Sequence, residues 1–436
     1  MDNFTPSAVH NTAQQALQLM QKQGFDHAQV SVGALRRSEV CVAHNEASLL
    51  RSTAGHKVAL VGLLDGRRAA SEGSSIDLPS LRANVAELWA SVASAPQDAA
   101  NAVSAGQHLQ HVRGQAAADD TAAPNDVLAL AMAELLDWRA AHTPAVMLED
   151  ALAGHNHHHG CTLTSSGSEL RTDQSWFDSA VFALAREGGR ASSFNSADGS
   201  TDSLQGLPVA QRFGIGSLMQ SLEQQIHPQP MGARFQGPVL LTPPAVASLL
   251  AWLLGQLADQ ALIDGSSVYR AGVGQTVTST ALTLKSRFDA PGVAPRSADG
   301  FVAAPVELLT QGRLNTLTPS LYGSLKTGLP HVPLASQGWD MAPGSAPLAE
   351  LMSGVQRGAL VDRLSMGRPA ANGDFSGVIK NSFLIDSGQR GHALAETMIS
   401  GNVAQMLRDV RSASSERIDT GAWVLPWLLV QGLHFS

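Results

Sequence analysis

The sequence predicts an α+β protein whose N-terminal part alternates helices with antiparallel strands and whose C-terminal domain is rich in β-strands. In the first part of the chain, segments with apolar residues at helical spacing alternate with segments in which apolar residues recur at every second position. From Pro238 onward the composition shifts to short apolar runs punctuated by Gly and Pro. We therefore expect two domains, residues 1–230 and residues 231–436.

A first unit of helix, antiparallel meander and helix is expected over about residues 1–95. Residues 7–24 carry apolar side chains at helical spacing and end at Gly24, a residue suited to a left-handed helix cap. Alternating apolar segments separated by turn-forming pairs follow as far as about residue 73, which predicts the meander. Helical spacing returns from Leu78 and closes the unit.

The same order of elements is expected again over about residues 125–230. Residues 96–124 are rich in Ala, Gln and Asp with little periodic apolar content, so we interpret them as a connector. A helix that Asn125 can cap follows, then strands, then a further helical segment. The repeated order indicates a duplicated architecture. In the C-terminal domain only three helices are expected, near residues 243–260, 346–362 and 402–411.

Composition excludes several classes of function. The net charge is -8 and no run of Lys and Arg is present, which argues against nucleic acid as a partner. No uninterrupted apolar run reaches about 18 residues, so no membrane span is expected. The first ten residues lack the pattern of a secretory leader, and Cys41 and Cys161 are the only cysteines, so a cytoplasmic location is expected.

The segment HNHHHG places four of the fifteen histidines within six positions. On a strand, His155, His157 and His159 would share one face and could hold zinc. A catalytic zinc site also needs a carboxylate base near the bound water, and no carboxylate lies between Asp150 and Glu169. We therefore favour a polar hairpin tip that binds metal only adventitiously, and we predict no metal site and no cofactor. The GxSxG, P-loop, GxGxxG and HExxH motifs are absent as well.

The segment NGDFSGVIKNSFLIDSGQRGHALAETMISGN, from residue 372 to 402, resembles a signature of the TldD/PmbA family. Asp374 to Gly377 correspond to a D-x-x-S-G-like turn of that family, and Ile399 to Asn402 correspond to its ISGN element. The resemblance extends to the opening helix and strand and to a central helix near Ala245, and it is looser over the first 230 residues.

This resemblance implies a function. TldD-type members are zinc peptidases with an HExxxH motif on the central helix and a cysteine ligand near the C-terminus, and their PmbA or TldE-type partners lack both. The resemblance places Ala251 and Trp252 at the first His and the Glu, and Gln256 at the second His, while the region from Ile418 contains no cysteine. These side chains can neither bind zinc nor activate its water. The chain is thus expected to be the non-catalytic subunit of a cytoplasmic complex with a TldD-type catalytic subunit that cleaves unfolded peptides.

Two alternatives stay open at this point: a self-sufficient metallopeptidase with an atypical site, and a non-enzymatic peptide-binding protein that forms homodimers. A homodimer is expected when the chain is isolated. One segment, with a strong turn sequence and two glycines that allow a backbone to approach closely, is expected to contact substrate or partner, although a purely structural turn would look the same. Its residues are Asn372, Gly373, Asp374, Phe375, Ser376 and Gly377.

Overall fold

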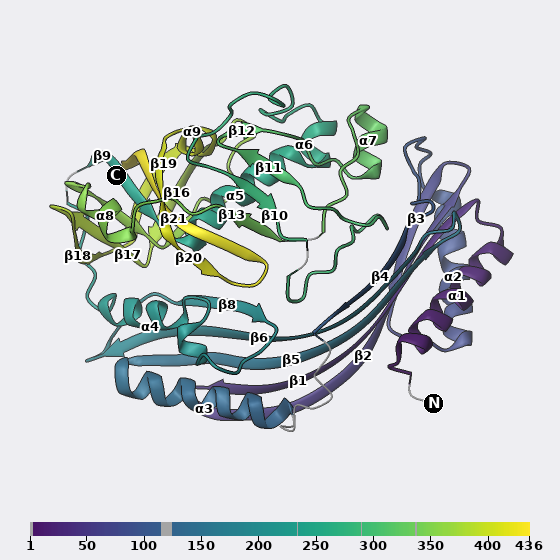
Figure 1. Ribbon diagram of the computed structural model, residues 1–436, viewed down its shortest axis with the longest axis horizontal. Coiled ribbons are helices and arrows are strands. Elements are labelled where there is room, and N and C mark those ends of the chain that lie inside the picture. The colour runs from purple at the N-terminus through teal and green to yellow at the C-terminus, as the bar shows by residue number, and fades with distance from the viewer. Residues whose placement is uncertain (1–2, 115–123, 233, 289, 336–337) are drawn as a thin grey trace.

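The structure, a computed structural model, describes residues 3–114, 124–232, 234–288, 290–335 and 338–436. The chain forms one long, curved N-terminal sheet and a β-rich C-terminal domain that lies on the concave side of this sheet (Figure 1). This confirms the predicted α+β class, with helices and antiparallel strands in the N-terminal part and a β-rich C-terminal domain. No helix in the described part of the chain is both long and apolar enough to cross a membrane.

The first unit has the predicted order of helix, antiparallel meander and helix, and its meander has three strands because β1 continues through Arg37 and Ser38. Thr5 caps the first helix by accepting a hydrogen bond from the Ala8 amide at 3.2 Å, and Gly24 ends it with a φ of 103°. Asp65 and Gly66 both have positive φ and connect the second and third strands as a two-residue hairpin. The elements are α1 (Pro6–Gln23), β1 (His27–Ala43), β2 (Glu46–Leu64), β3 (Arg67–Gly73) and α2 (Leu78–Ser94).

The second unit also has helices at both ends, but the predicted connector contributes a strand. Within residues 96–124, β4 (His108–Arg113) pairs with β6 in parallel. This pairing explains why periodicity missed the strand, since short segments held by a neighbouring strand need little alternation of their own. The remaining elements are α3 (Pro124–His142), β5 (Val146–Thr164), β6 (Glu169–Glu187), β7 (Arg190–Ala191), β8 (Asn195–Thr201), the short 3-10 helix η1 (Val209–Gln211) and α4 (Ile215–Gln224).

The two units share one sheet, because β1 pairs with β5 in antiparallel register from Gln29 opposite Thr164 to Val42 opposite Ala151. The strand order is β3-β2-β1-β5-β6-β4, with β7 and β8 also paired to β6. Helices α1, α2 and α3 cover the convex face (Figure 1). Helices and sheet form two separate apolar cores. One lies between α1, α2 and strands β1 and β2, and the other lies between α3, α4 and strands β5 and β6.

The C-terminal domain packs a mixed sheet around α5, whose buried side carries Leu249, Leu250 and Leu253. Of the three helices expected here, the one near residues 346–362 is wrong in its second half, which forms a strand antiparallel to a neighbour. The helices are α5 (Pro243–Leu257), α6 (Asp259–Ile263), α7 (Leu321–Thr327), α8 (Leu348–Ser353) and α9 (Val403–Arg408). The strands are β9 (Phe235–Leu241), β10 (Leu284–Ser286), β11 (Glu307–Thr310), β12 (Arg313–Leu314), β13 (Trp339–Met341), β14 (Arg357–Val361), β15 (Arg363–Ser365), β16 (Asp374–Lys380), β17 (Ser382–Asp386), β18 (Gln389–Leu394), β19 (Thr397–Asn402), β20 (Val410–Asp419) and β21 (Trp423–Phe435).

Candidate functional site

Two of the three predicted motif positions on α5, Trp252 and Gln256, carry side chains that pack within the domain, whereas Ala251 is exposed. Trp252 donates its indole N–H to the Ala370 carbonyl at 3.3 Å, and its ring meets Tyr269 edge to face with centroids 6.0 Å apart. Gln256 is buried, and its Oε1 accepts a hydrogen bond from the Val268 amide at 3.1 Å. The Trp252 N–H and the Gln256 oxygen thus have hydrogen-bond partners within the chain.

The predicted contact segment is a turn followed by a strand. Gly373 has a φ of 96°, which favours glycine, so the turn lies at Asn372 and Gly373. The residues from Asp374 onward form the start of β16 rather than a turn, and their exposure alternates. Asn372, Asp374 and Ser376 are exposed, whereas Gly373 and Phe375 are buried.

Gly377 does not lie at a turn, because it is in β16 and has no positive φ. It is close to its own chain: a Cβ atom there would lie 2.2 Å from the Ser365 carbonyl oxygen and 3.0 Å from the Met366 Cα. The backbone segment that lies close to Gly377 is therefore β15 of the same chain. The contact role predicted for the segment rests on its three exposed polar residues.

Asn402 joins the two parts of the segment that carries the family resemblance. It lies opposite Asp374 in the register of β16 and β19 and donates to the Asp374 carboxylate at 2.8 Å and to the Asn372 carbonyl at 3.0 Å. Its own side-chain oxygen accepts from the Gln405 amide and caps α9. Hydrogen bonds from Asn402 and Asn372 lower the pKa of Asp374, so this exposed carboxylate stays charged.

The turn at Gly373 rests on the helix that carries the motif positions. A Cβ atom at Gly373 would lie 3.2 Å from the Trp252 ring and 3.1 Å from the Ala404 amide nitrogen. The structure thus brings the second motif position and the predicted contact segment together, although they are more than a hundred residues apart in the sequence. Gln256 lies one helical turn further along α5, on its buried side.

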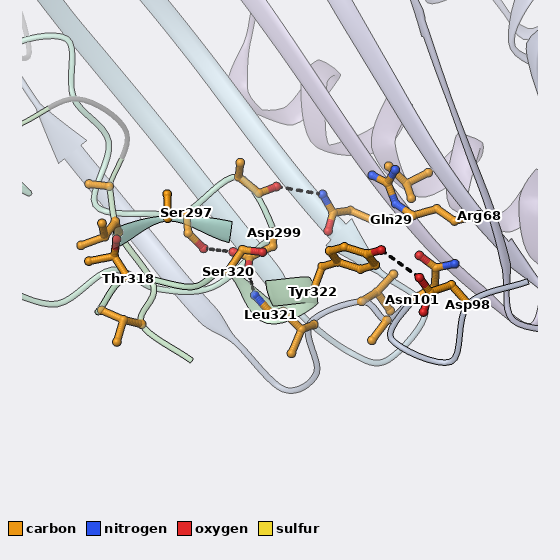
Figure 2. Close-up of a pocket in the computed structure, with 18 of the residues that line it drawn as sticks. Gln29, Arg68, Asp98, Asn101, Ser297, Asp299, Thr318, Ser320, Leu321 and Tyr322 are labelled. Carbon is orange, nitrogen blue, oxygen red and sulfur yellow. Dashed lines mark hydrogen bonds between the residues drawn. The ribbon is translucent and has the colours of Figure 1, made fainter. Parts of the chain in front are cut away.

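A cavity of about 850 Å³ lies between the N-terminal sheet and the C-terminal domain. Figure 2 shows polar side chains from both parts of the chain around it, including Gln29, Asn101 and Ser320. Leu254 of α5 and Ala258, the residue that follows the helix, also line it, and helical spacing places Ala251 on the same face of α5 as Leu254.

Two carboxylates organise the rim of this cavity. Asp98 accepts hydrogen bonds from the Tyr322 hydroxyl at 2.8 Å (Figure 2) and from the Lys326 ammonium at 3.0 Å, which links the N-terminal part to α7. Hydrogen bonds from the Ala100 amide, Lys326 and Tyr322 lower the pKa of Asp98 to about 2.

The second carboxylate, Asp299, accepts from the Leu321 amide at 2.7 Å and lies 3.1 Å from the His331 ring nitrogen. No motif marks Asp98 or Asp299, because both carboxylates lie in irregular segments of the chain.

The histidine segment is placed differently from the prediction. It lies in the middle of β5, so the predicted hairpin tip is wrong; the turn of that hairpin comes after Thr164. His155, His157 and His159 share one face, as predicted: the His157 and His159 rings lie 4.4 Å apart between centroids, and His155 Nε2 lies 2.8 Å from the Ser175 hydroxyl.

The carboxylate that the sequence lacks nearby comes from the adjacent strand. Asp173 Oδ1 lies 3.1 Å from His157 Nε2 and 3.2 Å from His159 Nδ1. Asp173 is opposite His159 in the register of β5 and β6, a pairing across a hairpin that residue spacing alone does not reveal.

His158 points to the opposite, concave face of the sheet. It lines a smaller space together with Gln174, Trp176 and Arg296 of the C-terminal domain. Burial and the nearby Arg296 lower the pKa of His158 to about 4, so the ring is neutral at pH 7.

The architecture defines a class: two helix–strand–helix units share a curved sheet that holds a β-rich domain over a cavity. Residues 235–436 match the family model of the PmbA/TldA metallopeptidase C-terminal domain. No curated protein matches the chain in sequence.

Three solved structures have a similar fold over nearly the whole chain. TldE from Thermococcus kodakarensis has a TM-score of 0.81 at 16% identity and covers 98% of this chain and 100% of its own. A protein described as a modulator of DNA gyrase from Bacteroides thetaiotaomicron gives 0.82 at 19% identity, with 99% of both chains covered. Another from Thermotoga maritima gives 0.78 at 16% identity, with 98% and 100% covered. At these identities the likeness shows the fold.

A peptidase zinc ion does not fit the residues present on α5. Ala251 and Trp252 offer no ligand atom, and the Gln256 oxygen is engaged by the Val268 amide. Within the described residues, the candidate metal ligands that lie close together are His157, His159 and Asp173, which belong to the N-terminal sheet. No catalytic step through a metal is therefore derived for this chain.

Proposed function

We propose that this protein is the PmbA (TldE)-type, non-catalytic subunit of a cytoplasmic metallopeptidase complex that cleaves unfolded peptides together with a TldD-type catalytic subunit. One observation carries the proposal. The helix of the C-terminal domain on which a peptidase of this family would hold zinc has Ala251, Trp252 and Gln256 at the ligand and base positions. Trp252 and Gln256 are hydrogen-bonded within the domain, so this helix supports the fold instead of binding metal.

The cavity supports a role in holding peptide. An extended peptide needs hydrogen-bonding partners for its backbone and shallow space for its side chains. The cavity is lined by Gln29, Asn101 and Ser320 beside apolar Leu254 and Leu334. The side-chain nitrogens of Gln29 and Asn101 and the Ser320 hydroxyl donate within the chain, so the side-chain oxygens of Gln29 and Asn101 are the groups that can accept hydrogen bonds from a peptide backbone. The TldD-type subunit would supply the zinc and the base, and this chain would complete the chamber.

The exposed first half of β2 supports association with another subunit. From Glu46 to Gly55 every residue is exposed, and within the described residues β3 pairs only with the part of β2 from Val58 onward. The backbone groups of this edge can pair with a strand from a partner, and Leu49 and Leu50 add apolar surface, 44% and 58% exposed. We propose this edge as the interface with the TldD-type subunit, and with a second copy when the chain is isolated.

Co-purification tests the proposal. The chain is expressed with a TldD-type protein from the same source, and hydrolysis of an unfolded peptide is measured for each chain alone and for the mixture. We expect a stable complex, and no hydrolysis by this chain alone. Hydrolysis by this chain alone that a chelator abolishes would identify a self-sufficient metallopeptidase. A homodimer that binds peptide but does not bind the TldD-type protein would identify a non-enzymatic binding protein.

A further inference from the structure

The convex face of the N-terminal sheet carries a polar row between its two apolar cores. Along β5, Ala153 belongs to the core under α3, and Cys161 belongs to the core under α1 and α2. The side chains on the same face between them are His155, His157 and His159, and they belong to neither core. The His157 side chain is 42% exposed, so solvent reaches this row.

Three side chains in this row converge. The ligand atoms of His157, His159 and Asp173 all lie within 4.8 Å of one another. Four ligands placed tetrahedrally at about 2.0–2.1 Å from a zinc ion lie about 3.3 Å apart. The separations of 3.1 and 3.2 Å from the Asp173 oxygen to the two ring nitrogens are close to that spacing. The third separation, between the two ring nitrogens, is at most 4.8 Å and would have to shorten for one ion to contact all three groups.

His159 provides an independent sign that the group of His157, His159 and Asp173 lacks a binding partner. Its Nδ1 atom is buried and has no hydrogen-bond partner of acceptable geometry, although the Asp173 oxygen is 3.2 Å away. A buried ring nitrogen without a partner is costly and calls for an explanation.

Two neighbours set limits to this site. His155 is hydrogen-bonded to Ser175 and lies outside the converging group. Arg36 is opposite His157 in the register of β1 and β5, so its positive charge opposes a cation. Its guanidinium lies 5.1 Å from the Phe4 ring centroid. The charge of Asp173 is thus partly offset, which favours reversible rather than very tight binding.

From this arrangement we infer that His157, His159 and Asp173 form a binding site for a divalent transition-metal ion, with zinc as the best match to two imidazoles and one carboxylate. The fourth position is open to water. The site is in the N-terminal sheet, on the face opposite the C-terminal domain, so it would bind metal away from the cavity between the two. It does not depend on the function proposed above.

Zinc titration of the untagged chain, first stripped with a chelator, tests this inference by calorimetry. We expect one zinc ion per chain. His157→Gln, His159→Gln and Asp173→Asn should each weaken binding at least tenfold, and Arg36→Gln should strengthen it. His155→Gln is the matched control on the same face of the same strand, and it should change the affinity less than about twofold.

A spectroscopic measurement keeps the test independent of how well the variants fold. Cobalt(II) added to the unmodified chain should give the intense visible absorption of a four-coordinate ion, and zinc should displace it. Absence of both zinc binding and this absorption would overturn the inference. So would equal loss of affinity in His155→Gln, His158→Gln and His157→Gln, because the histidine run would then bind metal without a defined site.

Discussion

Replacing Gly377 by Val should destabilise the C-terminal domain through a steric clash. The new Cβ would lie 2.2 Å from the Ser365 carbonyl oxygen, and that oxygen belongs to the backbone of β15, which pairs with β16. Because backbone on both sides must move, we expect a cost of about 2–3 kcal/mol, the upper range for overpacking. For a domain of this size, the melting temperature should fall by roughly 4–12 °C.

Ser376→Val is the matched control, because it places the same side chain on the adjacent, exposed position of β16. Its free energy of unfolding should stay within about 0.5 kcal/mol of the parent. Thermal melts and urea denaturation of both variants measure the difference. If Gly377→Val melts like the parent, the close approach of β15 is not present in solution. If partner binding is lost in Ser376→Val while its stability is retained, the exposed residues of the segment are a contact surface.

Three further predictions concern other parts of the chain. Burial lowers the pKa of His158 to about 4, whereas the ring has a pKa of about 6.5 in the unfolded chain. The free energy of unfolding should therefore be highest above about pH 6.5 and should decrease by up to about 3 kcal/mol as the pH falls to about 4. Urea denaturation across this range should show a weaker pH dependence of the free energy of unfolding in His158→Gln than in the parent. An unchanged pH dependence would contradict the burial of the His158 ring. Leu50→Asp on the β2 edge should weaken subunit association at least tenfold in sedimentation, whereas Leu325→Asp, equally exposed on α7, should not; equal effects would exclude the edge as the interface. Replacing all four histidines of residues 155–159 by Ser should leave partner-dependent cleavage per folded molecule nearly unchanged, and a loss above about tenfold, or about 1.4 kcal/mol of barrier, would show that they take part.

The elements that the sequence predicts well are those whose signals are local. Thr5 and Gly24 delimit α1 by their own capping chemistry, and alternation identifies β1 and β2. The predicted helix near residues 346–362 failed in its second half because its apolar run fits a buried strand equally well. The strand β14 there is fixed by pairing with β9 and β17, which are distant in the sequence.

The candidate sites depend on contacts that no local pattern contains. Asp173 meets His157 and His159 only because β5 and β6 pair in one register, and a shift by one residue would place it on the other face. Asp98 meets Tyr322 across more than two hundred residues of chain. The resemblance over residues 372–402 identified Asn402 and Asp374 together, and the structure explains their pairing by two hydrogen bonds from Asn402 into the same turn.

The measurement that tests the proposed function most directly is the rate of peptide cleavage in a mixture of the two subunits when only the TldD-type partner is changed. Replacing the glutamate of the partner's HExxxH motif by glutamine should abolish cleavage, because Ala251, Trp252 and Gln256 of this chain supply neither a zinc ligand nor a base. Trp252→Phe in this chain, with the partner intact, should leave the rate within about threefold. Zinc-dependent cleavage that persists with the altered partner would contradict the account and assign catalysis to this chain.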